Sequence, residues 1–306
     1  MPTTNNITTT YAGEATRSFI SAALLSSPTI YNGNVSVLPN IKYQQVVRKF
    51  ETDGLLADAS CDFTDTSTLT TVERILTPKS LQVNLEVCKA DYRDTWDAIS
   101  MGYSAHDVLP PDFASYLVSY AAAKVAAANE TSVWQGATGN SGEFDGFETL
   151  LATNAAQPAA QEIAGTTLSK GNIVAELEKI EDQITSALYT EDMGIYLGTA
   201  GIKYYVQAQA ALGYLDKFHV GKTQLDFHGI PLIHSPGMSA DTAVCAQKSN
   251  LWFGTGLLND TNEVKVIDLA DIDGSQNVRV VMRMTAGTQF GNGEDIITYG
   301  IVNASN

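Results

Sequence analysis

The four histidines, His106, His219, His228 and His234, are the side chains best suited to acid–base or metal chemistry near neutral pH. None belongs to an HExxH motif, and none lies one helical turn from another ligand. His228 and His234 flank the stretch GIPLI, where an extended strand would place both side chains on one face. A two-histidine metal site is therefore one alternative, against the simpler interpretation of two unrelated polar residues.

Two short motifs resemble ligand-binding loops without completing them. HVGKT (219–223) is similar to the end of a Walker A loop, but Asp216 stands where the first glycine belongs. DLADIDGSQNVRV (268–280) is similar to a calcium loop, but Leu269 and Val280 occupy the positions of its first and last acids, so we interpret it as a turn between strands. The chain has no GxSxG motif, and its three cysteines are too widely spaced for a CxxC site or a disulfide framework. The sequence predicts no catalytic residue, no metal and no cofactor.

Composition and charge narrow the class of protein. The 306 residues are 44% hydrophobic and 17% charged, which is enough apolar material for a packed core. No apolar run reaches the ~20 residues of a membrane helix, and the first residues do not have the pattern of a secretory signal. The net charge is −16, yet the first fifty residues carry four basic side chains and one acid. We expect an acidic body that does not wrap nucleic acid, with a mildly basic arm that can lie over an acidic neighbour.

The amino-terminal third of the chain reads as an arm followed by a projecting hairpin. Residues 1–40 are rich in Thr, Asn, Ser, Gly and Pro, with one apolar island at 19–25. Residues 41–50 have strand character, residues 51–71 are polar and rich in turn formers, and residues 81–87 alternate between apolar and polar. The two strands, joined by some thirty polar residues, predict a long hairpin that projects from a body.

Three helices and several strands are predicted beyond the hairpin. An Ala-rich helix begins at Pro110–Pro111 and continues through residue 130 as a spine. Apolar residues at helical spacing, Ile173, Leu177, Ile180, Ile184 and Leu188, predict a second helix, and residues 201–212 predict a third. Beyond residue 224 the pattern changes to strands, among them two at 263–272 and 277–286 joined by the turn DGSQ.

The stretch VWQGATGNSGEFDGFETLL (133–151) raises the question of a phosphate-binding loop. Such a loop follows a strand and precedes a helix, whereas these glycines follow a helix, and the acids Glu143 and Asp145 would repel phosphate. The stretch is therefore not expected to bind a nucleotide phosphate.

The order of these elements resembles the major capsid proteins of tailed bacteriophages, those with the Hong Kong 97 fold. VWQGATGNSGEFDGF after the spine helix is similar to a passage of that family, as are residues 61–96 and the stretch GIPLIHSPGMSADTAVCAQKSNLWFGTGLLND. The resemblance covers nearly the whole chain and implies an α+β fold. It implies four parts: an N-terminal arm (1–38), an extended loop (39–85), a peripheral domain (86–140 and 262–306) and an axial domain (141–261).

The resemblance also implies that residues 133–151 form the corner at which the chain leaves the spine helix for the axial domain. The corner residues are Trp134, Gly136, Gly142, Phe144 and Gly146. The glycines are expected at positive φ, and the aromatic rings, together with Phe147, are expected in the core.

The resemblance also implies a function and partners. The chain is expected to be a structural protein rather than an enzyme, and to assemble with itself into pentamers and hexamers of an icosahedral shell around double-stranded DNA. A separate scaffolding protein, a portal protein and decoration proteins are the expected further partners, without specific DNA binding and without a membrane. The expected location is the virion, after synthesis in the bacterial cytoplasm. Arg17, Glu73 and Arg74 are the candidates for inter-subunit contacts. Some family members form Lys–Asn crosslinks, for which Lys79 on the extended loop is the candidate lysine.

Two other functions remain open from the sequence. An encapsulin-like compartment shares the fold but encloses a cargo enzyme, and a neighbouring gene for such an enzyme would favour it. A soluble enzyme or a carbohydrate-binding tail component would instead form a small oligomer with a pocket of convergent polar groups.

Overall fold

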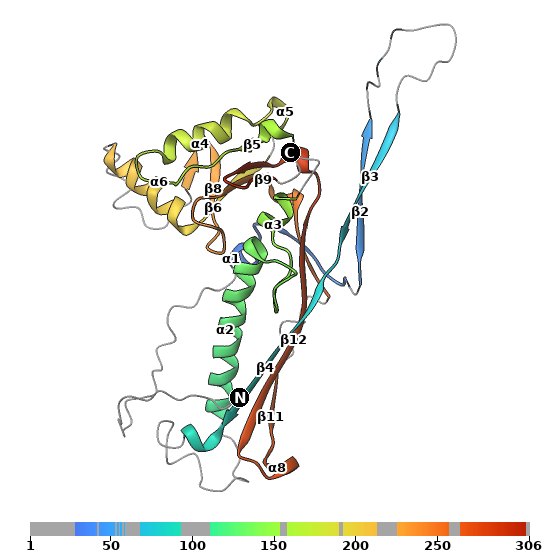
Figure 1. Cartoon of the computed structure of the whole chain (residues 1–306), viewed down its shortest axis with the longest axis vertical. Helices are drawn as coiled ribbons and strands as arrows, with labels where there is room; N and C mark the ends of the chain where they lie inside the picture. The colour runs from blue at the N-terminus through green and yellow to red at the C-terminus, as the bar shows by residue number, and fades with distance from the viewer. Residues whose placement is uncertain are drawn as a thin grey trace.

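The structure is a computed structural model that describes residues 28–41, 43–52, 54, 56, 58, 68–92, 111–153, 158–189, 192–212, 225–256 and 264–303. The fold is mixed α and β, and the molecule is elongated (Figure 1). A long sheet with a helix beside it forms the shaft, a second sheet with helices forms one end, and a two-stranded hairpin projects past that end (Figure 1). The predicted α+β class is confirmed.

The hairpin consists of β2 (Gln45–Thr52) and β3 (Leu69–Leu76), paired antiparallel from Gln45↔Leu76 to Thr52↔Leu69. The predicted hairpin is confirmed, but its second strand was assigned wrongly. Residues 69–71 belong to a strand and not to the turn-rich segment, because the β-branched run LTTVERI favours extended backbone. The alternating segment at 81–87 lies in β4 (Lys79–Cys88), which belongs to the shaft.

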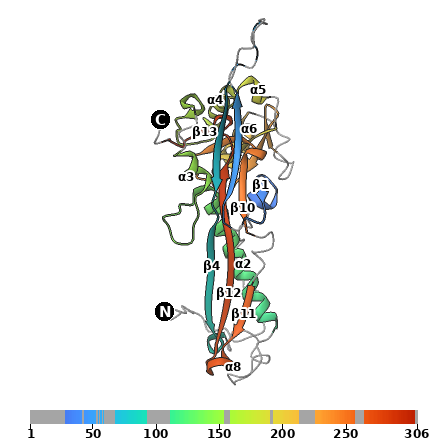
Figure 2. The ribbon, with the colours of Figure 1, turned by 90° about the vertical axis from the view of Figure 1, so that its right-hand side faces the viewer.

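The shaft is a five-stranded sheet built on β12 (Asn277–Phe290). One edge of β12 pairs with β4, and the other pairs first with β11 (Val264–Asp268) and then with β10 (Leu251–Thr255). Strand β1 (Ser36–Leu38) continues the sheet parallel to β10. The turn predicted at DGSQ does separate β11 from β12, and Gly274 there has a φ of 71°. The strand predicted at 263–272 was too long, because residues 270–272 belong to the short helix α8 (Ala270–Asp273). Helix α2 (Pro111–Gln135) runs along this sheet (Figure 2).

The second sheet has six strands in the order β5-β13-β9-β6-β8-β7. Their bounds are Glu162–Ile163 for β5, Ile297–Tyr299 for β13, Ala243–Gln247 for β9, Met193–Leu197 for β6, Ile230–His234 for β8 and Leu225–Phe227 for β7. Helices α4 (Ile173–Asp182) and α6 (Thr199–Ala211) pack on one face. The predicted helix at 173–188 is interrupted, because α4 ends at Asp182 and α5 (Ser186–Tyr189) starts a new turn, although Ile184 still packs in the same cluster.

The two hydrophobic cores share this sheet, because alternate residues of its strands point to opposite faces. Along β6, Ile195 and Leu197 face the core under α4 and α6, whereas Tyr196 faces the core beside α2. Strand β9 divides in the same way, with Cys245 on the first side and Val244 on the second. All five residues of β6 are buried, as expected for a strand covered on both faces.

Sheet membership and the four predicted parts of the chain differ at four strands. Strand β1 lies within the predicted arm but pairs with β10, and most of β4 lies within the predicted extended loop but pairs with β12 of the shaft. Strand β10 lies within the predicted axial range but pairs with β12 of the shaft. Strand β13 lies within the predicted peripheral range but pairs with β9 and β5 of the second sheet. The boundaries at residues 38, 85, 140 and 261 stay predictions.

Candidate functional site

The corner after the spine helix is packed around aromatic rings. Trp134 is fully buried, and its ring centroid lies 5.4 Å from those of both Phe147 and Tyr196. Phe144 is also buried and contacts Phe253 of β10 edge-on, with centroids 6.3 Å apart. The predicted core positions of these corner rings are confirmed, and the corner joins α2 to the shaft sheet and to β6.

The corner glycines act mainly through close approach of backbones, so the predicted reason was wrong for two of the three. A Cβ on Gly136 would lie 2.2 Å from the carbonyl oxygen of Phe144, and one on Gly146 would lie 2.4 Å from that of Trp134. Only Gly142 has a positive φ, 82°, and its surroundings are open. Two chain segments cross at Gly136 and Gly146, where the amide of Gly146 donates to the carbonyl of Gly136 over 2.9 Å.

The exposed loop of the corner, residues 137–143, binds the ammonium of Lys79 and the carboxylates of Glu143 and Asp145. The Lys79 ammonium donates to the carbonyl oxygens of Thr138, Asn140 and Glu143 at 3.0, 3.2 and 2.7 Å. The Glu143 carboxylate accepts from the Asn140 side chain and from the Ala137 amide, and these hydrogen bonds, aided by Lys79, lower its pKa. Lys79, the candidate crosslinking lysine, begins β4 and holds this loop through these hydrogen bonds, and its crosslinking to another subunit stays a prediction.

A clasp joins the segment around residue 29 to the spine helix. The Thr29 hydroxyl donates to the Glu130 carboxylate and accepts from Trp134 Nε1, and the Thr29 amide donates to the other Glu130 oxygen over 3.2 Å. All three residues are fully buried, and Glu130 and Trp134 lie one helical turn apart. Residues 28–38, predicted as the last part of the arm, therefore pack against the body. No sequence pattern indicated this contact, because it joins residues 101 positions apart in the chain.

The residues predicted for inter-subunit contacts have separate surroundings. Glu73 forms an ion pair across the hairpin with Arg48, with Nε and Oε1 2.8 Å apart. The Arg74 guanidinium lies 4.7 Å from the centre of the Phe290 ring, and burial lowers its pKa. Arg17 lies outside the described residues. Glu73 and Arg74 are successive residues of β3, so their side chains lie on opposite faces of the hairpin. Their role between subunits stays a prediction.

One face of the hairpin exposes a row of apolar side chains. Val46, Phe50, Leu69 and Ile75 are 47%, 64%, 65% and 48% exposed, and the cross-strand register places them on the same face as the Arg48–Glu73 pair. Among the described residues, β2 and β3 pair only with each other. The alternation of Val46, Arg48 and Phe50 could have shown this face in the sequence, once the partner strand was assigned correctly.

The histidines within the described part of the chain do not converge. His228 lies in the turn before β8 with a φ of 47°, and its Nδ1 contacts a Glu181 carboxylate oxygen at 2.6 Å. His234 contacts the Thr199 hydroxyl at 2.9 Å. Across the residues the structure describes, no three His, Cys, Asp or Glu side chains gather closely enough to hold a metal ion.

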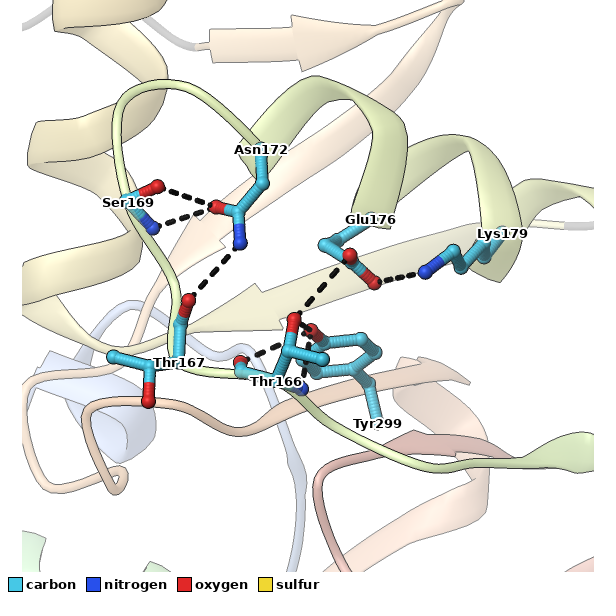
Figure 3. Close-up of polar contacts among 7 residues, drawn as sticks. All are labelled: Thr166, Thr167, Ser169, Asn172, Glu176, Lys179 and Tyr299. Atoms are coloured by element: carbon cyan, nitrogen blue, oxygen red, sulfur yellow. Dashed lines mark hydrogen bonds and ion pairs between the residues drawn. The ribbon is translucent and has the colours of Figure 1, made fainter.

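A polar cluster fixes the loop before α4 (Figure 3). The Tyr299 hydroxyl accepts from the Thr166 amide over 2.9 Å, and the Thr166 hydroxyl donates to the buried Glu176 carboxylate, which also accepts from Lys179 over 2.8 Å. Burial raises the Glu176 pKa, but the hydrogen bonds from Lys179, Tyr299 and Thr166 outweigh it, so the net pKa is lowered. A carboxylate held ionised by three neighbours serves as an anchor rather than as a proton donor.

We expect Glu176 to stabilise the fold above its ordinary pKa and to lose that contribution as the pH falls through its lowered pKa. Urea unfolding at pH 7 and at pH 3 measures this. Glu176→Gln should be less stable than the parent at pH 7, and this deficit should be smaller at pH 3. Glu178→Gln on the exposed face of α4 is the control and should follow the parent at both pH values. An equal deficit of Glu176→Gln at both pH values would show that the carboxylate charge is unimportant.

None of the helices in the described part of the chain is long and apolar enough to cross a bilayer.

Comparisons with known proteins bear on the fold. No family model and no curated protein matches this chain by sequence. Among solved structures, the chain is similar to the capsid of a native GTA particle with C5 symmetry, with 14% identity, a TM-score of 0.65, and coverage of 92% of this chain and 93% of that one. It is similar to the capsid of the cyanophage P-SCSP1u, with 12% identity, a TM-score of 0.59, and coverage of 98% and 94%.

The capsid of the Myoviridae phage XM1 gives a third match, with 11% identity, a TM-score of 0.58, and coverage of 94% of this chain and 95% of that one. All three similarities extend over nearly the full length of both chains. They confirm the phage capsid fold that the order of sequence elements predicted.

Proposed function

We propose that the chain is the major capsid protein of a tailed phage, and that it assembles with itself into pentamers and hexamers of an icosahedral head around double-stranded DNA. The capsid fold supports the class of protein. The exposed apolar face of the hairpin is the observation that carries the proposal of self-assembly.

The hairpin needs a partner for physical reasons. An isolated two-stranded hairpin is marginally stable in water, and this one projects from the body (Figure 1). Its Phe50 and Leu69 side chains are exposed to solvent. A neighbouring copy that covers this face would bury the apolar side chains and shield the Arg48–Glu73 pair from water. Such a contact joins different surfaces of two copies, and repetition of it by rotation closes a ring.

The charge of the chain supports enclosure of DNA rather than binding to it. With a net charge of −16, the shell would present few Lys and Arg side chains to phosphate groups. We propose that the protein resides in the virion, and that separate scaffolding, portal and decoration proteins are its further partners. The contacts that Arg17, Glu73 and Arg74 make with them or with other copies belong to the same proposal.

A structural role is supported further by the polar clusters of the described residues. The side chains of Glu130, Glu148 and Glu176 are bound by hydroxyl, amide or ammonium groups of their own chain. These carboxylates cross-link elements of the fold, and that use favours a shell component over a soluble enzyme.

Light scattering and negative-stain imaging of the purified protein, alone and with the scaffolding gene co-expressed, test the proposal. Rings of five or six or closed shells support self-assembly, and packaged DNA rather than a protein cargo distinguishes a phage head from an encapsulin-like compartment. A monomer or dimer at every concentration, even with the scaffold, would rule out a shell protein.

A further inference from the structure

The end of β3 is fixed to the end of β12 by two side chains. The Arg74 guanidinium lies over the Phe290 ring at 4.7 Å from its centre. On the next residue, the Ile75 carbonyl oxygen accepts from Gln289 Nε2 over 3.0 Å. Consecutive residues of the hairpin are therefore held by consecutive residues of the shaft sheet.

Packing against β10 fixes the same end of the hairpin from the inside. Leu76 is 1% exposed, and a Cβ on Gly254 would lie 2.4 Å from Leu76 Cδ2 and 2.9 Å from Ile41 Cδ1. The Ile41 amide also donates to the Thr255 carbonyl over 3.0 Å. Both chain segments that lead into the hairpin thus rest on the same short stretch of β10.

The connection from the hairpin into β4 is held as well. Gly287 allows β12 to approach Pro78, because a Cβ there would lie 3.0 Å from Pro78 Cα. One residue later, Lys79 directs its ammonium at the carbonyls of Thr138, Asn140 and Glu143. An ammonium has three N–H donors, so this contact engages all of them.

From these contacts we infer that residues 74–79 are seated in a socket that fixes the direction of the hairpin before any partner binds. The socket consists of the ends of β10 and β12 and the corner loop 137–143. Lys79 is a positioning residue of this socket, because its ammonium binds three backbone carbonyl oxygens of the corner loop. The inference that a neighbouring copy uses this fixed direction rests on the proposed function, whereas the socket itself does not.

A fixed direction matters because ordering a mobile element on binding reduces affinity. A hairpin that is already aligned loses little conformational entropy when a neighbour covers its apolar face. Five residues of the segment 74–79 contact β10, β12 or the corner loop, and these contacts restrict tilting of the hairpin. A hinge differs, because a few unrestrained residues there absorb the motion.

Distances between two spin labels in the dilute, unassembled subunit test the socket. The labels go on Thr71→Cys in β3 and Lys170→Cys in the loop before α4, both exposed, in a Cys61→Ser, Cys88→Ser background. Cys245 stays, because it is fully buried and burial raises its pKa to about 12. We expect one narrow distance distribution. A broad distribution in this parent would overturn the inference.

Lys79→Met and the double variant Lys79→Met, Gln289→Ala identify the socket residues. We expect loss of the single narrow peak in both variants, with the greater broadening in the double variant. Lys203→Met, which removes an exposed ammonium on α6, should keep the narrow peak. Methylammonium chloride should narrow the distribution of Lys79→Met again, and sodium chloride at the same ionic strength should not. An unchanged peak in both Lys79 variants would remove Lys79 from the socket.

The outcome separates the socket from the proposed function. A narrow distribution in a protein that never assembles keeps the socket and rejects the capsid role. A broad distribution in a protein that forms shells rejects the socket and keeps the capsid role.

Discussion

Phe50→Glu should prevent assembly at concentrations where the parent forms rings or shells, without unfolding the subunit. Phe50 is 64% exposed in the single chain, so its replacement removes little packing there. If a neighbour buries the ring, each contact loses about 2 kcal/mol, which corresponds to about a 30-fold weaker association per contact. Because every copy in a shell makes the contact, the losses accumulate. Sedimentation velocity across a concentration series measures the effect.

Leu212→Glu is the matched control for this experiment. Leu212 follows α6 on the body and is 68% exposed. Its replacement by Glu also exchanges an exposed apolar side chain for a charged one, but at a position away from the hairpin. We expect parental assembly from it, and parental melting temperatures from both variants. Shells of Phe50→Glu at the parental concentration would show that the apolar face of the hairpin is not an interface.

Gly136→Ala should destabilise the subunit by about 3 kcal/mol or more, because overpacking between two backbones cannot be relieved by rotating a side chain. Its Cβ would lie 2.2 Å from the Phe144 carbonyl oxygen and 2.6 Å from that of Ser132. The crossing of the two segments would have to open, and Trp134 would lose its packing. Urea denaturation monitored by tryptophan fluorescence measures the change.

Two other glycines of the corner distinguish close backbone approach from backbone strain as the cause of the loss of stability. At Gly139 a Cβ would meet nothing within 4 Å, so Gly139→Ala should change the stability by less than about 0.5 kcal/mol. At Gly142 the space is open but φ is 82°, so Gly142→Ala should cost about 1 kcal/mol through backbone strain alone. Equal losses at all three positions would contradict close approach as the role of Gly136.

Local patterns in the sequence determined most of the secondary structure. The Ala-rich run after Pro111 forms α2, the stripe from Ile173 to Ile180 forms α4, and the turn at Gly274 separates β11 from β12. These features depend on residues within a few positions of one another, where propensity and periodicity act. The resemblance to capsid proteins, which rests on the order of the elements and on matching sequence stretches, predicted the capsid fold and the buried corner rings.

Only the tertiary structure decided which segments pair and which residues meet. The alternating residues of β4 are equally suited to a hairpin or to the shaft sheet, and burial of Leu81 and Val87 beside β12 favours the shaft. The corner glycines were identified correctly, but their reason, the crossing of two backbones, is visible only when both segments are placed. The clasp of Thr29 with Glu130 and the contact of Lys79 with the corner loop join residues far apart in the chain. No local pattern encodes such contacts, because they arise from the packing of complete elements.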